Sequence, residues 1–510
     1  MAYLLGLDIG TTSMKCALYN ADSGRVVRTA SRPTPVNHPQ PGWSEHDPLE
    51  LWNAAANCIR EAAQAAGPDL NGIAGLAISS MAEAGVLVDA QGQPLAPVIA
   101  WYDRRSEPQA AWVEQQTGVE PLYRITGQRA SPSFGVTKLL WLRDERPDLF
   151  SRGVMWQPVP AYLMARLCGQ PAVDYTIAAR TLLFDQHSLN WSAVLCETFG
   201  LDPSLLPPVY PGGTPIGRLS AAAAAATGLP PGTSCVLGGQ DHLCASLAAG
   251  GHQSGTIVDS TGSASALLLL LPRFLPDPAL AWRSYACYAY VLPGLFALKG
   301  ALKAAGSAIE WLARQLSNGH DIDYAKLEAA AAQGAGKRAG PLWLPHLIGS
   351  GSPEGDRFSS AAMVGVQFEH DRGDLFRGML ESIAFWLRRN LDDMRALTGA
   401  EISQVRLIGG VTRLRLLSQL KADVLNQPVI VPLVPESAAV GAALLAGIGA
   451  GVFSSPADAV ASLRYGCEQI DPIPGHVDWY ETMYQTIYRP LYDALQPINR
   501  AFTAMRRQDS

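Results

Sequence analysis

The sequence predicts an α/β protein made of two related domains that face each other. Three observations predict this class. The chain has 510 residues, whereas a single hydrophobic core stops growing near about 250–300 residues. Apolar stretches of strand length alternate with stretches of helical period. Two distant segments, 8–19 and 259–271, also share one pattern, in which an aspartate precedes a Gly/Thr/Ser turn and an apolar strand follows.

The first half is predicted to alternate strands and helices. The first expected helix begins at Pro48, and a second, alanine-rich one is ended by Gly228 and Pro230. In order, the expected elements are strands at 4–8 and 14–19, a helix at 48–66, a pair of strands at 75–79 and 85–89, a helix at 220–227 and a strand at 234–237.

The second half contains the clearest helix. Apolar residues recur at three- and four-residue steps from 374 to 397, and Gly399 ends the pattern. The other expected elements are strands at 255–259, 264–271, 405–408 and 428–431 and helices at 414–425 and 436–446. We expect domains at 1–249 and 254–455, separated by a glycine-containing segment, and a helical tail at 456–510.

Composition excludes several classes of function. The formal net charge is -6 and no Lys/Arg run occurs, so a nucleic-acid partner is not expected. The longest leucine run, 267–271, is far shorter than the ~20 residues that cross a bilayer. The eight cysteines are scattered, and no signal-peptide pattern opens the chain. We therefore expect a cytoplasmic protein with free thiols and no membrane partner.

The first candidate site is the octet Asp8-Ile9-Gly10-Thr11-Thr12-Ser13-Met14-Lys15. Its turn offers backbone N–H groups and three hydroxyls to phosphate oxygens. Lys15 adds a positive charge, and Asp8 offers an oxygen ligand to the Mg²⁺ that accompanies phosphates. A polar hairpin turn is the alternative explanation. The complete octet after an apolar strand favours phosphate binding.

The second candidate is Gly238-Gly239-Gln240-Asp241-His242, where an apolar strand runs into a helix of small residues. Asp241 could serve only as a helix N-cap. It could also be a carboxylate held at a cleft, which accepts the proton of a substrate hydroxyl. A third group, Trp101-Tyr102-Asp103-Arg104, suits a polyhydroxylated ligand, although alone it is explained by a buried tryptophan and a salt bridge.

Taken together, these segments resemble the FGGY carbohydrate kinase family of the actin/sugar kinase/Hsp70 superfamily. The order and spacing of the motifs carry the resemblance from Leu4 to about Gly451. Besides the segments above, they include Gly42-Trp43-Ser44-Glu45, Lys138-Leu139-Leu140-Trp141-Leu142, Gly300 with Gly306, Leu380-Glu381-Ser382, Gly409-Gly410, Ala422-Asp423-Val424-Leu425 and Val440-Gly441-Ala442-Ala443.

The resemblance implies two ribonuclease-H-like (actin-like ATPase) domains, with ATP, Mg²⁺ and a sugar in the cleft between them. It implies Asp241 as the catalytic base, and Asp8 and Asp241 near the metal. The sugar-binding residues would be Glu83, Trp101, Asp103 and Asp241. The ATP-binding residues would be Thr11, Thr12, Ser13, Lys15, Gly262, Ser263, Gly306, Gly409 and Gly410.

The same resemblance favours D-xylulose, converted to xylulose 5-phosphate, as the reaction. Ala82-Glu83 stands where xylulokinases carry a Met-His pair, so the hydroxyl pattern read there can differ. A kinase for glycerol, erythritol, ribulose, fuculose or gluconate remains an alternative. A non-kinase ATPase of the actin kind is a further one, although no peptide-binding domain follows Gly451. Family likeness also suggests a homodimer.

Overall fold

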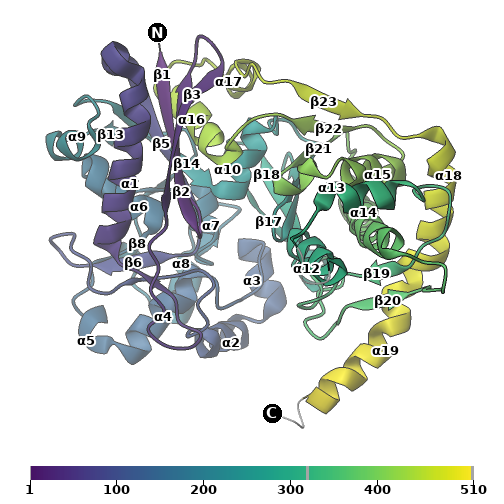
Figure 1. Ribbon diagram of the computed structural model, residues 1–510. Helices are drawn as coiled ribbons and strands as arrows, with labels where there is room; N and C mark the ends of the chain where they lie inside the picture. The colour runs from purple at the N-terminus through teal and green to yellow at the C-terminus, as the bar shows by residue number, and fades with distance from the viewer. Residues whose placement is uncertain (1, 318–320, 507–510) are drawn as a thin grey trace.

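The computed structural model describes residues 2–317 and 321–506 and consists of two α/β halves, each built around a central sheet (Figure 1). The sheet of the first half has the order β13-β14-β5-β1-β2-β3, in which β1 runs parallel to β5 and antiparallel to β2. Its strands are β1 (Tyr3–Ile9), β2 (Ser13–Asn20), β3 (Arg25–Pro33), β5 (Ile73–Ser80), β13 (Pro215–Arg218) and β14 (Ser234–Gln240).

The helix α1 (Pro48–Ala63) lies against strands β2 and β3 of this sheet. Asp47 caps it by accepting hydrogen bonds from the backbone N–H groups of Leu49 and Glu50, and it buries one alanine-rich face. The sequence predicted a helix to residue 66. The α-helix ends earlier because the chain continues as 3₁₀ turns through Gln64–Gly72, where Gly67 has a φ of 54°.

The predicted pairing of residues 75–79 with 85–89 is wrong. Strand β5 lies inside the main sheet between β14 and β1, whereas β6 (Gly85–Val88) belongs to a separate four-stranded sheet. The prediction assumed a hairpin, in which strands that are consecutive in the sequence pair with each other. Strand β5 is instead apolar and buried along almost its whole length, which suits a central strand with a neighbour on each side. The other strands of the small sheet are β4 (Glu45–His46), β7 (Val98–Ile99) and β8 (Met155–Pro158).

The small sheet is accompanied by helices that complete the lower part of the first half (Figure 1). They share an apolar cluster with Leu87 and Trp156 of the sheet. These helices are α2 (Glu107–Thr117), α3 (Val119–Thr126), α4 (Gly135–Glu145), α5 (Pro147–Phe150) and α8 (Ala193–Phe199). The remaining elements of the first half are α6 (Val159–Cys168), α7 (Tyr175–Ala179), α9 (Ala221–Thr227), β9 (Val173–Asp174), β10 (Phe184–Asp185), β11 (Asn190–Trp191) and β12 (Val209–Tyr210).

The second half has a seven-stranded sheet in the order β17-β18-β16-β15-β21-β22-β23. Strands β15 and β16 form the antiparallel pair that the sequence predicted, and β21 runs parallel to β15. The strands are β15 (Thr256–Thr261), β16 (Ser265–Leu271), β17 (Ala286–Ala289), β18 (Phe296–Leu302), β21 (Gln404–Ile408), β22 (Val429–Pro432) and β23 (Cys467–Ile470).

The predicted long helix of the second half is confirmed as α14 (Arg372–Thr398). Its N-terminus carries a capping box between Asp371 and Asp374, and Gly399 ends it in the left-handed conformation. The neighbouring elements are α11 (Pro278–Trp282), α12 (Gly306–Leu316), α13 (Tyr324–Ala332), α15 (Arg415–Leu425), β19 (Leu342–Leu344) and β20 (Ala362–Val364).

Two helices join the halves. The helix α10 (Asp241–Ala248) packs on α16 (Ser437–Gly449). The helix α16 also crosses strands β1 and β5 of the first sheet, although in sequence it lies between β22 and β23 of the second sheet (Figure 1). Small residues permit this approach, since a Cβ at Gly441 would overlap the carbonyl oxygen of Cys244. The predicted helix at 436–446 is therefore part of the connection between the domains.

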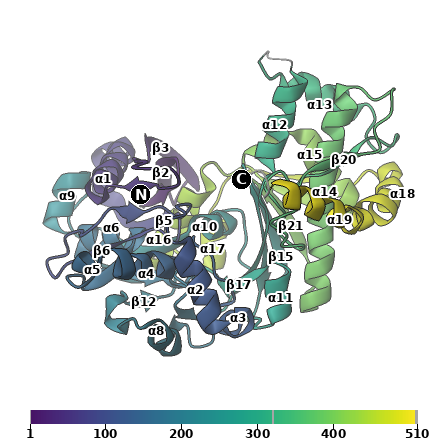
Figure 2. The ribbon, with the colours of Figure 1, turned by 90° about the horizontal axis from the view of Figure 1, so that it is seen from below.

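The C-terminal segment begins with α17 (Pro456–Ala461), which packs on α16 beside the first half. It then passes to the outside of the second half, where α18 (Pro474–Met483) lies (Figure 2). After a π-helical turn at Tyr484–Tyr488, the last helix α19 (Arg489–Arg506) projects from the body (Figure 1). The domain limits at 249, 254 and 455 and the homodimer stay predictions.

Candidate active site in the interdomain cleft

The first phosphate loop is the turn of the β1–β2 hairpin. The backbone N–H of Gly10 donates to the carbonyl of Ser13 at 3.1 Å, which closes the turn. Trp101 Nε1 donates to Thr11 Oγ1 at 2.9 Å and holds that hydroxyl in place. The octet therefore forms a hairpin turn, and Thr12 is exposed on it. The same turn is the one predicted to bind phosphate.

Asp8 stands at the end of β1, where its carboxylate accepts a hydrogen bond from Ser79 Oγ at 2.9 Å. Burial, and after it the nearby charge of Asp241, raise the pKa of Asp8 to about 7. Lys15 and the Ser79 hydrogen bond oppose this shift. Two carboxylates that repel each other across a small gap form a site where a hard divalent cation would relieve the repulsion.

Asp241 is the first residue of α10, and the N-cap position belongs to Gln240. The backbone N–H of His242 donates to Asp241 Oδ1 at 2.6 Å, so the carboxylate has no capping bond to the next turn. Gln240 is held in turn, because Tyr288 Oη donates to its Oε1 at 2.9 Å and its N–H donates to Thr176 Oγ1 at 2.7 Å. These contacts orient the aspartate at the open end of the helix.

The second phosphate loop joins β15 to β16 and is attached to the N-terminus of α12. The N–H of Gly306 donates to the Gly262 carbonyl at 3.0 Å, and the N–H of Ser307 donates to the Ser263 carbonyl at 3.1 Å. Gly262 and Ser263 are exposed to the cleft side of this loop. The loop is thereby held open and rigid.

The two loops differ in their aspartates. Asp259 corresponds to Asp8 in the repeated pattern, but it is buried and accepts a hydrogen bond from Lys421 Nζ at 2.6 Å. Thr261 Oγ1 and Ser265 Oγ also donate to it, at 2.9 and 2.6 Å. Asp259 therefore supports its loop from below, and only Asp8 of the pair has a carboxylate directed at the cleft.

A cavity of about 470 Å³ lies beside the second loop. It is lined by Gly306, Ile309, Tyr324, Ala325, Glu328, Gly410, Val411, Arg413 and Leu414. A second cavity of about 530 Å³ shares Gly410 and Arg413 with it and reaches Lys15. The two cavities together form a path from an apolar pocket in the second half to the phosphate loop of the first.

The three glycines assigned to this region have different tasks. A Cβ at Gly306 would overlap the Gly262 carbonyl, and a Cβ at Gly409 would overlap the Thr261 carbonyl, with φ at 100° as a further obstacle. These two glycines therefore permit close contact within the protein itself. Only Gly410 faces open space, as a glycine beside a bound nucleotide would.

Lys15 forms an ion pair with Glu436 at 2.8 Å, and each side chain is about one-third exposed. Glu436 belongs to the loop that leads into α16 and adopts the left-handed conformation, with φ at 44°. The ammonium of Lys15 is therefore held near the cavity by a residue more than four hundred positions away.

The predicted sugar-binding residue Glu83 lies on the other side of Asp241. Its backbone has a φ of 69°, which is unusual for a residue with a side chain. Arg180 Nε donates to its Oε1 at 2.5 Å, and Arg180 also binds Gln128 Oε1. The guanidinium packs over the rings of Phe134 and Tyr288. Glu83 is thus fixed by an ion pair at the acceptor side of the cleft.

The two other predicted sugar-binding residues, Trp101 and Asp103, differ in their exposure to solvent. Trp101 is exposed and lies at the edge of the first phosphate loop. Asp103 is buried, and its two oxygens accept hydrogen bonds from the Ser44 N–H and from the guanidinium of Arg105. Its predicted contact with a sugar is not favoured by this arrangement, in which Asp103 holds Arg105 beneath Trp43.

Comparison with known proteins identifies the family. Residues 3–248 match the N-terminal domain of the FGGY family of carbohydrate kinases, and residues 259–450 match its C-terminal domain. The chain belongs to the FGGY family of carbohydrate kinases. It is therefore an ATP-dependent carbohydrate kinase with the two-domain fold of actin-like ATPases, which confirms the predicted fold and class of activity.

The kinase is similar to relatives of two specificities. It is 33% identical to a glycerol kinase of Citrifermentans bemidjiense over 475 residues, which covers 90% of the chain and 92% of that protein. It is 26% identical to the xylulose kinase of Bacillus subtilis, which covers 99% of the chain and 100% of that protein. The crystal structure of xylulose kinase from Rhodospirillum rubrum matches it with a TM-score of 0.90 at 31% identity, covering 98% of the chain and 100% of that structure.

Sequence reasoning missed several residues around the acceptor side of the kinase, namely Arg180, Gln128, Tyr288 and Lys299. Arg180 follows the short helix α7, and nothing in its immediate sequence indicates a ligand or a partner. Its partner Glu83 is 97 residues away, so no local pattern could have paired them.

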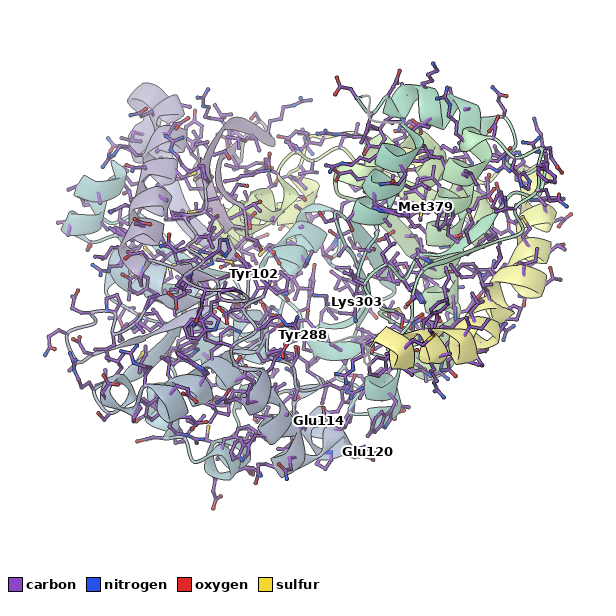
Figure 3. The ribbon with its side chains drawn as sticks, turned by 60° about the horizontal axis from the view of Figure 1, so that its bottom comes forward. Tyr102, Glu114, Glu120, Tyr288, Lys303 and Met379 are labelled. Atoms are coloured by element: carbon purple, nitrogen blue, oxygen red, sulfur yellow. The ribbon has the colours of Figure 1, made fainter. Side chains whose placement is uncertain are left out.

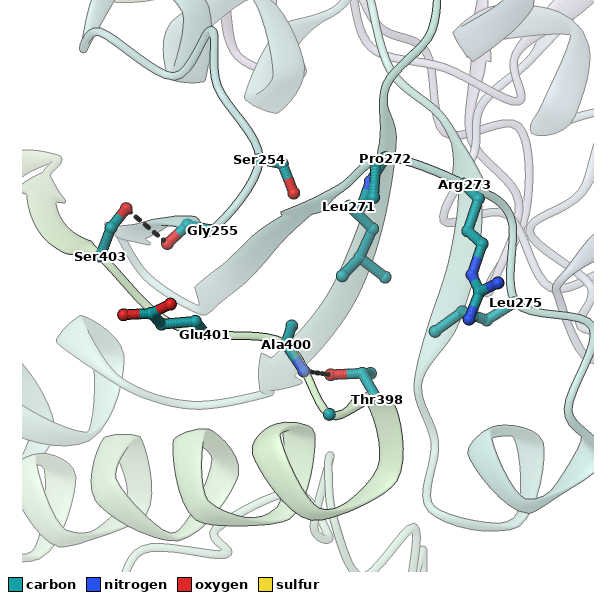
Figure 4. Close-up of a pocket in the computed structure, with 11 residues that line it drawn as sticks. Ser254, Gly255, Leu271, Pro272, Arg273, Leu275, Thr398, Ala400, Glu401 and Ser403 are labelled. Atoms are coloured by element: carbon teal, nitrogen blue, oxygen red, sulfur yellow. Dashed lines mark hydrogen bonds between the residues drawn. The ribbon is translucent and has the colours of Figure 1, made fainter.

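A cavity of about 550 Å³ lies elsewhere in the kinase (Figure 4). It is formed by the ends of β15 and β16 that are opposite the phosphate loop, together with the C-terminal end of α14. Ser403 Oγ donates to the Gly255 carbonyl at its wall, and the Ala400 N–H donates to Thr398 Oγ1. It is remote from Asp8 and Asp241 along the sheet.

Within residues 2–317 and 321–506, no helix of the kinase is long and apolar enough to cross a membrane. The cytoplasmic location stays a prediction.

Proposed function

We propose that the kinase transfers the terminal phosphate of ATP to D-xylulose and produces xylulose 5-phosphate, with Asp241 as the general base. The similarity to a xylulose kinase over 99% of the chain supports this substrate. The acceptor side supports it as well. Glu83, Arg180 and Lys299 lie near Asp241, so an acceptor aligned at the base meets a strongly polar wall, which suits a polyhydroxylated ketose.

The observation that carries the catalytic proposal is the position of Asp241 at the open N-terminus of α10, facing Asp8. A sugar hydroxyl is weakly acidic, and a positioned carboxylate that accepts its proton typically contributes about 10²–10⁴-fold. The rest of phosphoryl transfer requires alignment and neutralisation of charge. The two loops, with their hydroxyls, N–H groups and Lys15, supply both.

We assign the nucleotide to the two connected cavities. Adenosine would occupy the 470 Å³ pocket beside Gly410, and the phosphates would extend toward Lys15 and the two loops. The phosphate contacts then come from Thr11, Thr12, Ser13, Lys15, Gly262 and Ser263. Lys15 would exchange its bond to Glu436 for a phosphate oxygen.

The residues present fit a magnesium ion. Asp8 and Asp241 offer hard oxygen ligands of the kind that Mg²⁺ prefers. Burial and the nearby charge of Asp241 raise the pKa of Asp8, and a divalent cation between the two carboxylates would relieve their repulsion. The ion would be held by few protein ligands, as is usual for Mg²⁺ that arrives with ATP. When bound, it neutralises phosphate charge during transfer.

Glycerol is the second candidate, because the glycerol kinase of Citrifermentans bemidjiense has the higher identity of the two relatives, 33%. Release of ADP should be measured in a coupled assay with D-xylulose, glycerol, erythritol, ribulose and gluconate as acceptors. We expect D-xylulose to give the highest kcat/KM. A higher value with glycerol would overturn the proposed substrate and leave the class of activity intact.

The variant Asp241→Asn tests the base. We expect kcat with the best acceptor to fall by about 10²–10⁴-fold, while ATP binds with little change, because the nucleotide cavities are formed by other residues. The matched control is Asp148→Asn, an exposed aspartate in α5. Near-normal turnover of Asp241→Asn would show that another group accepts the proton.

A further inference from the structure

Lys299 lies on β18, on the face of the second sheet that meets the first half. It pairs with Leu268 of β16 and Ala286 of β17. Side chains alternate along a strand, so Lys299 shares its face with Tyr288, which is paired with Ala297 two residues away. Tyr288 and Leu268 belong to the apolar cluster that contains α10, and Tyr288 lies at the centre of the molecule (Figure 3).

The ammonium of Lys299 has no hydrogen bond and no ion pair with any of the residues at 2–317 and 321–506. The side chain is half-buried. Burial and the charge of Arg180, partly opposed by Glu83 and Asp241, lower the pKa of Lys299 to about 8. A partly desolvated cation without a partner is unfavourable, and a ligand oxygen placed there would relieve that cost.

The neighbouring charges are already matched. Arg180 is paired with Glu83, with side-chain exposures of 14% and 8%, and its remaining N–H groups reach Gln128. Tyr288 Oη donates to Gln240. Asp241 is reserved for the hydroxyl that receives the phosphate. Lys299 is therefore a cation on this side of the cleft that is left to bind a different oxygen of the acceptor. The His242 ring lies among the same charged groups and likewise has no hydrogen bond within the described residues.

We propose that Lys299 makes the kinase select acceptors that carry an acceptor-only oxygen, either a ketone carbonyl or a carboxylate, over plain polyols. The inference rests on the proposed function, because it concerns the acceptor that is aligned at Asp241. An ammonium group can only donate hydrogen bonds. A carbonyl or carboxylate oxygen directs its lone pairs at the ammonium without a competing proton, and hydrogen bonds to a charged group are stronger than neutral ones.

The test uses three acceptors with one carbon skeleton: D-xylulose (ketone), D-xylonate (carboxylate) and xylitol (polyol). For the wild type, Lys299→Met and Lys299→Arg, kcat/KM is measured by release of ADP, and binding is measured by calorimetry without ATP. The wild type should prefer xylulose or xylonate to xylitol. Lys299→Met should lose about 10–100-fold in kcat/KM with the preferred acceptor, lose much less with xylitol, and keep its affinity for ATP.

Comparison of xylonate with xylulose shows whether Lys299 binds a carboxylate oxygen or a ketone oxygen. A larger loss with xylonate than with xylulose identifies a carboxylate ligand, and the reverse identifies a ketone. Lys299→Arg should retain part of the preference, because a guanidinium also donates. The matched control is Lys337→Met, an exposed lysine in the loop before β19, which should keep the preference of the wild type.

Two results would overturn the inference: an equal loss with all three acceptors in Lys299→Met, or no binding of any of them to the wild type. Failure of the proposed function is distinguishable from both. If xylulose or xylonate binds in a Lys299-dependent way but no ADP is released, the acceptor site stands and the assigned reaction does not.

Discussion

At the scale of single residues, the site depends on charged groups that are kept in unfavourable surroundings. Asp8 is partly desolvated and faces a second carboxylate, and Glu83 has a left-handed backbone next to Arg180. Such features persist only where the surrounding structure enforces them. Their concentration around Asp241 distinguishes this part of the cleft from the rest of the surface.

The variant Asp8→Asn should show by how much the buried charge of Asp8 lowers the stability of the folded protein. Because the pKa of Asp8 is about 7 in the folded protein and lower when unfolded, folding is penalised increasingly as the pH rises toward and through 7. Removal of the charge should raise Tm by a few degrees at pH 8 and by less at pH 5.5. Turnover should fall strongly at both values.

Differential scanning calorimetry at the two pH values, together with the ADP-release assay, checks this prediction. Asp148→Asn, at the exposed site in α5, should shift Tm equally at both. A gain for Asp8→Asn that is the same at pH 5.5 and pH 8 would mean that the carboxylate is not the source of the cost.

At the scale of elements, the C-terminal helix α18 is attached to the core of the second half by Tyr480. Its hydroxyl donates to Glu381 Oε1 on α14 at 3.0 Å and accepts a hydrogen bond from the Gly336 N–H at 3.0 Å. Glu381 is also paired with the buried Arg377, and burial raises the pKa of Glu381 to about 7. One phenol thus satisfies two buried polar groups at once.

We expect Tyr480→Phe to lower the free energy of unfolding by about 1–3 kcal/mol, because it leaves the buried Gly336 N–H without a partner and Glu381 Oε1 with Arg377 alone. Turnover per folded molecule should change little, since Tyr480 is far from the cleft in the structure. Urea denaturation monitored by fluorescence measures the change. Tyr210→Phe, at an exposed tyrosine, is the control, and an equal loss there would contradict the role of Tyr480.

At the scale of the whole molecule, the two halves communicate through the helix pair α10–α16. The helix α10 carries Asp241 at its first residue, and α16 lies on the first sheet just after Glu436, the partner of Lys15. A change in the distance between these helices would therefore move the proposed base and the phosphate loop relative to each other.

Gly441→Ala is expected to lower kcat by at least about tenfold, because its Cβ would overlap the Cys244 carbonyl and force the two helices apart, and misplacement by about 1 Å can cost far more than that in rate. Steady-state kinetics with circular dichroism checks the rate and the fold together. Gly475→Ala, where the space around the Cβ is open, should behave as the wild type. Normal kcat in a folded Gly441→Ala protein would refute the coupling.

Some of these structural features could be predicted from the sequence, and others could not. Segments whose structure depends on adjacent residues were predicted correctly, such as the two pairs of adjacent strands, β1–β2 and β15–β16, and the helix α14 with its glycine stop. The pairing of residues 75–79 with 85–89 was wrong, because strand neighbours depend on the sheet as a whole. The burial of Asp103 under Arg105 was likewise invisible in a motif of adjacent residues.

By itself the sequence determined the class of protein and the proposed base, since a turn rich in Gly, Thr and Ser after a strand, or an aspartate at the start of a helix, is a local chemical pattern. Only the tertiary structure decided which aspartate of the repeated pattern faces the cleft. Asp259 forms a buried ion pair with Lys421, which is 162 residues away in the sequence, and this leaves Asp8 as the one that faces the cleft. It also decided that Glu83 is paired with Arg180 and that Lys299 has no hydrogen bond or ion pair within the part of the chain that the structure describes. These outcomes depend on the packing of distant strands, which no local periodicity encodes.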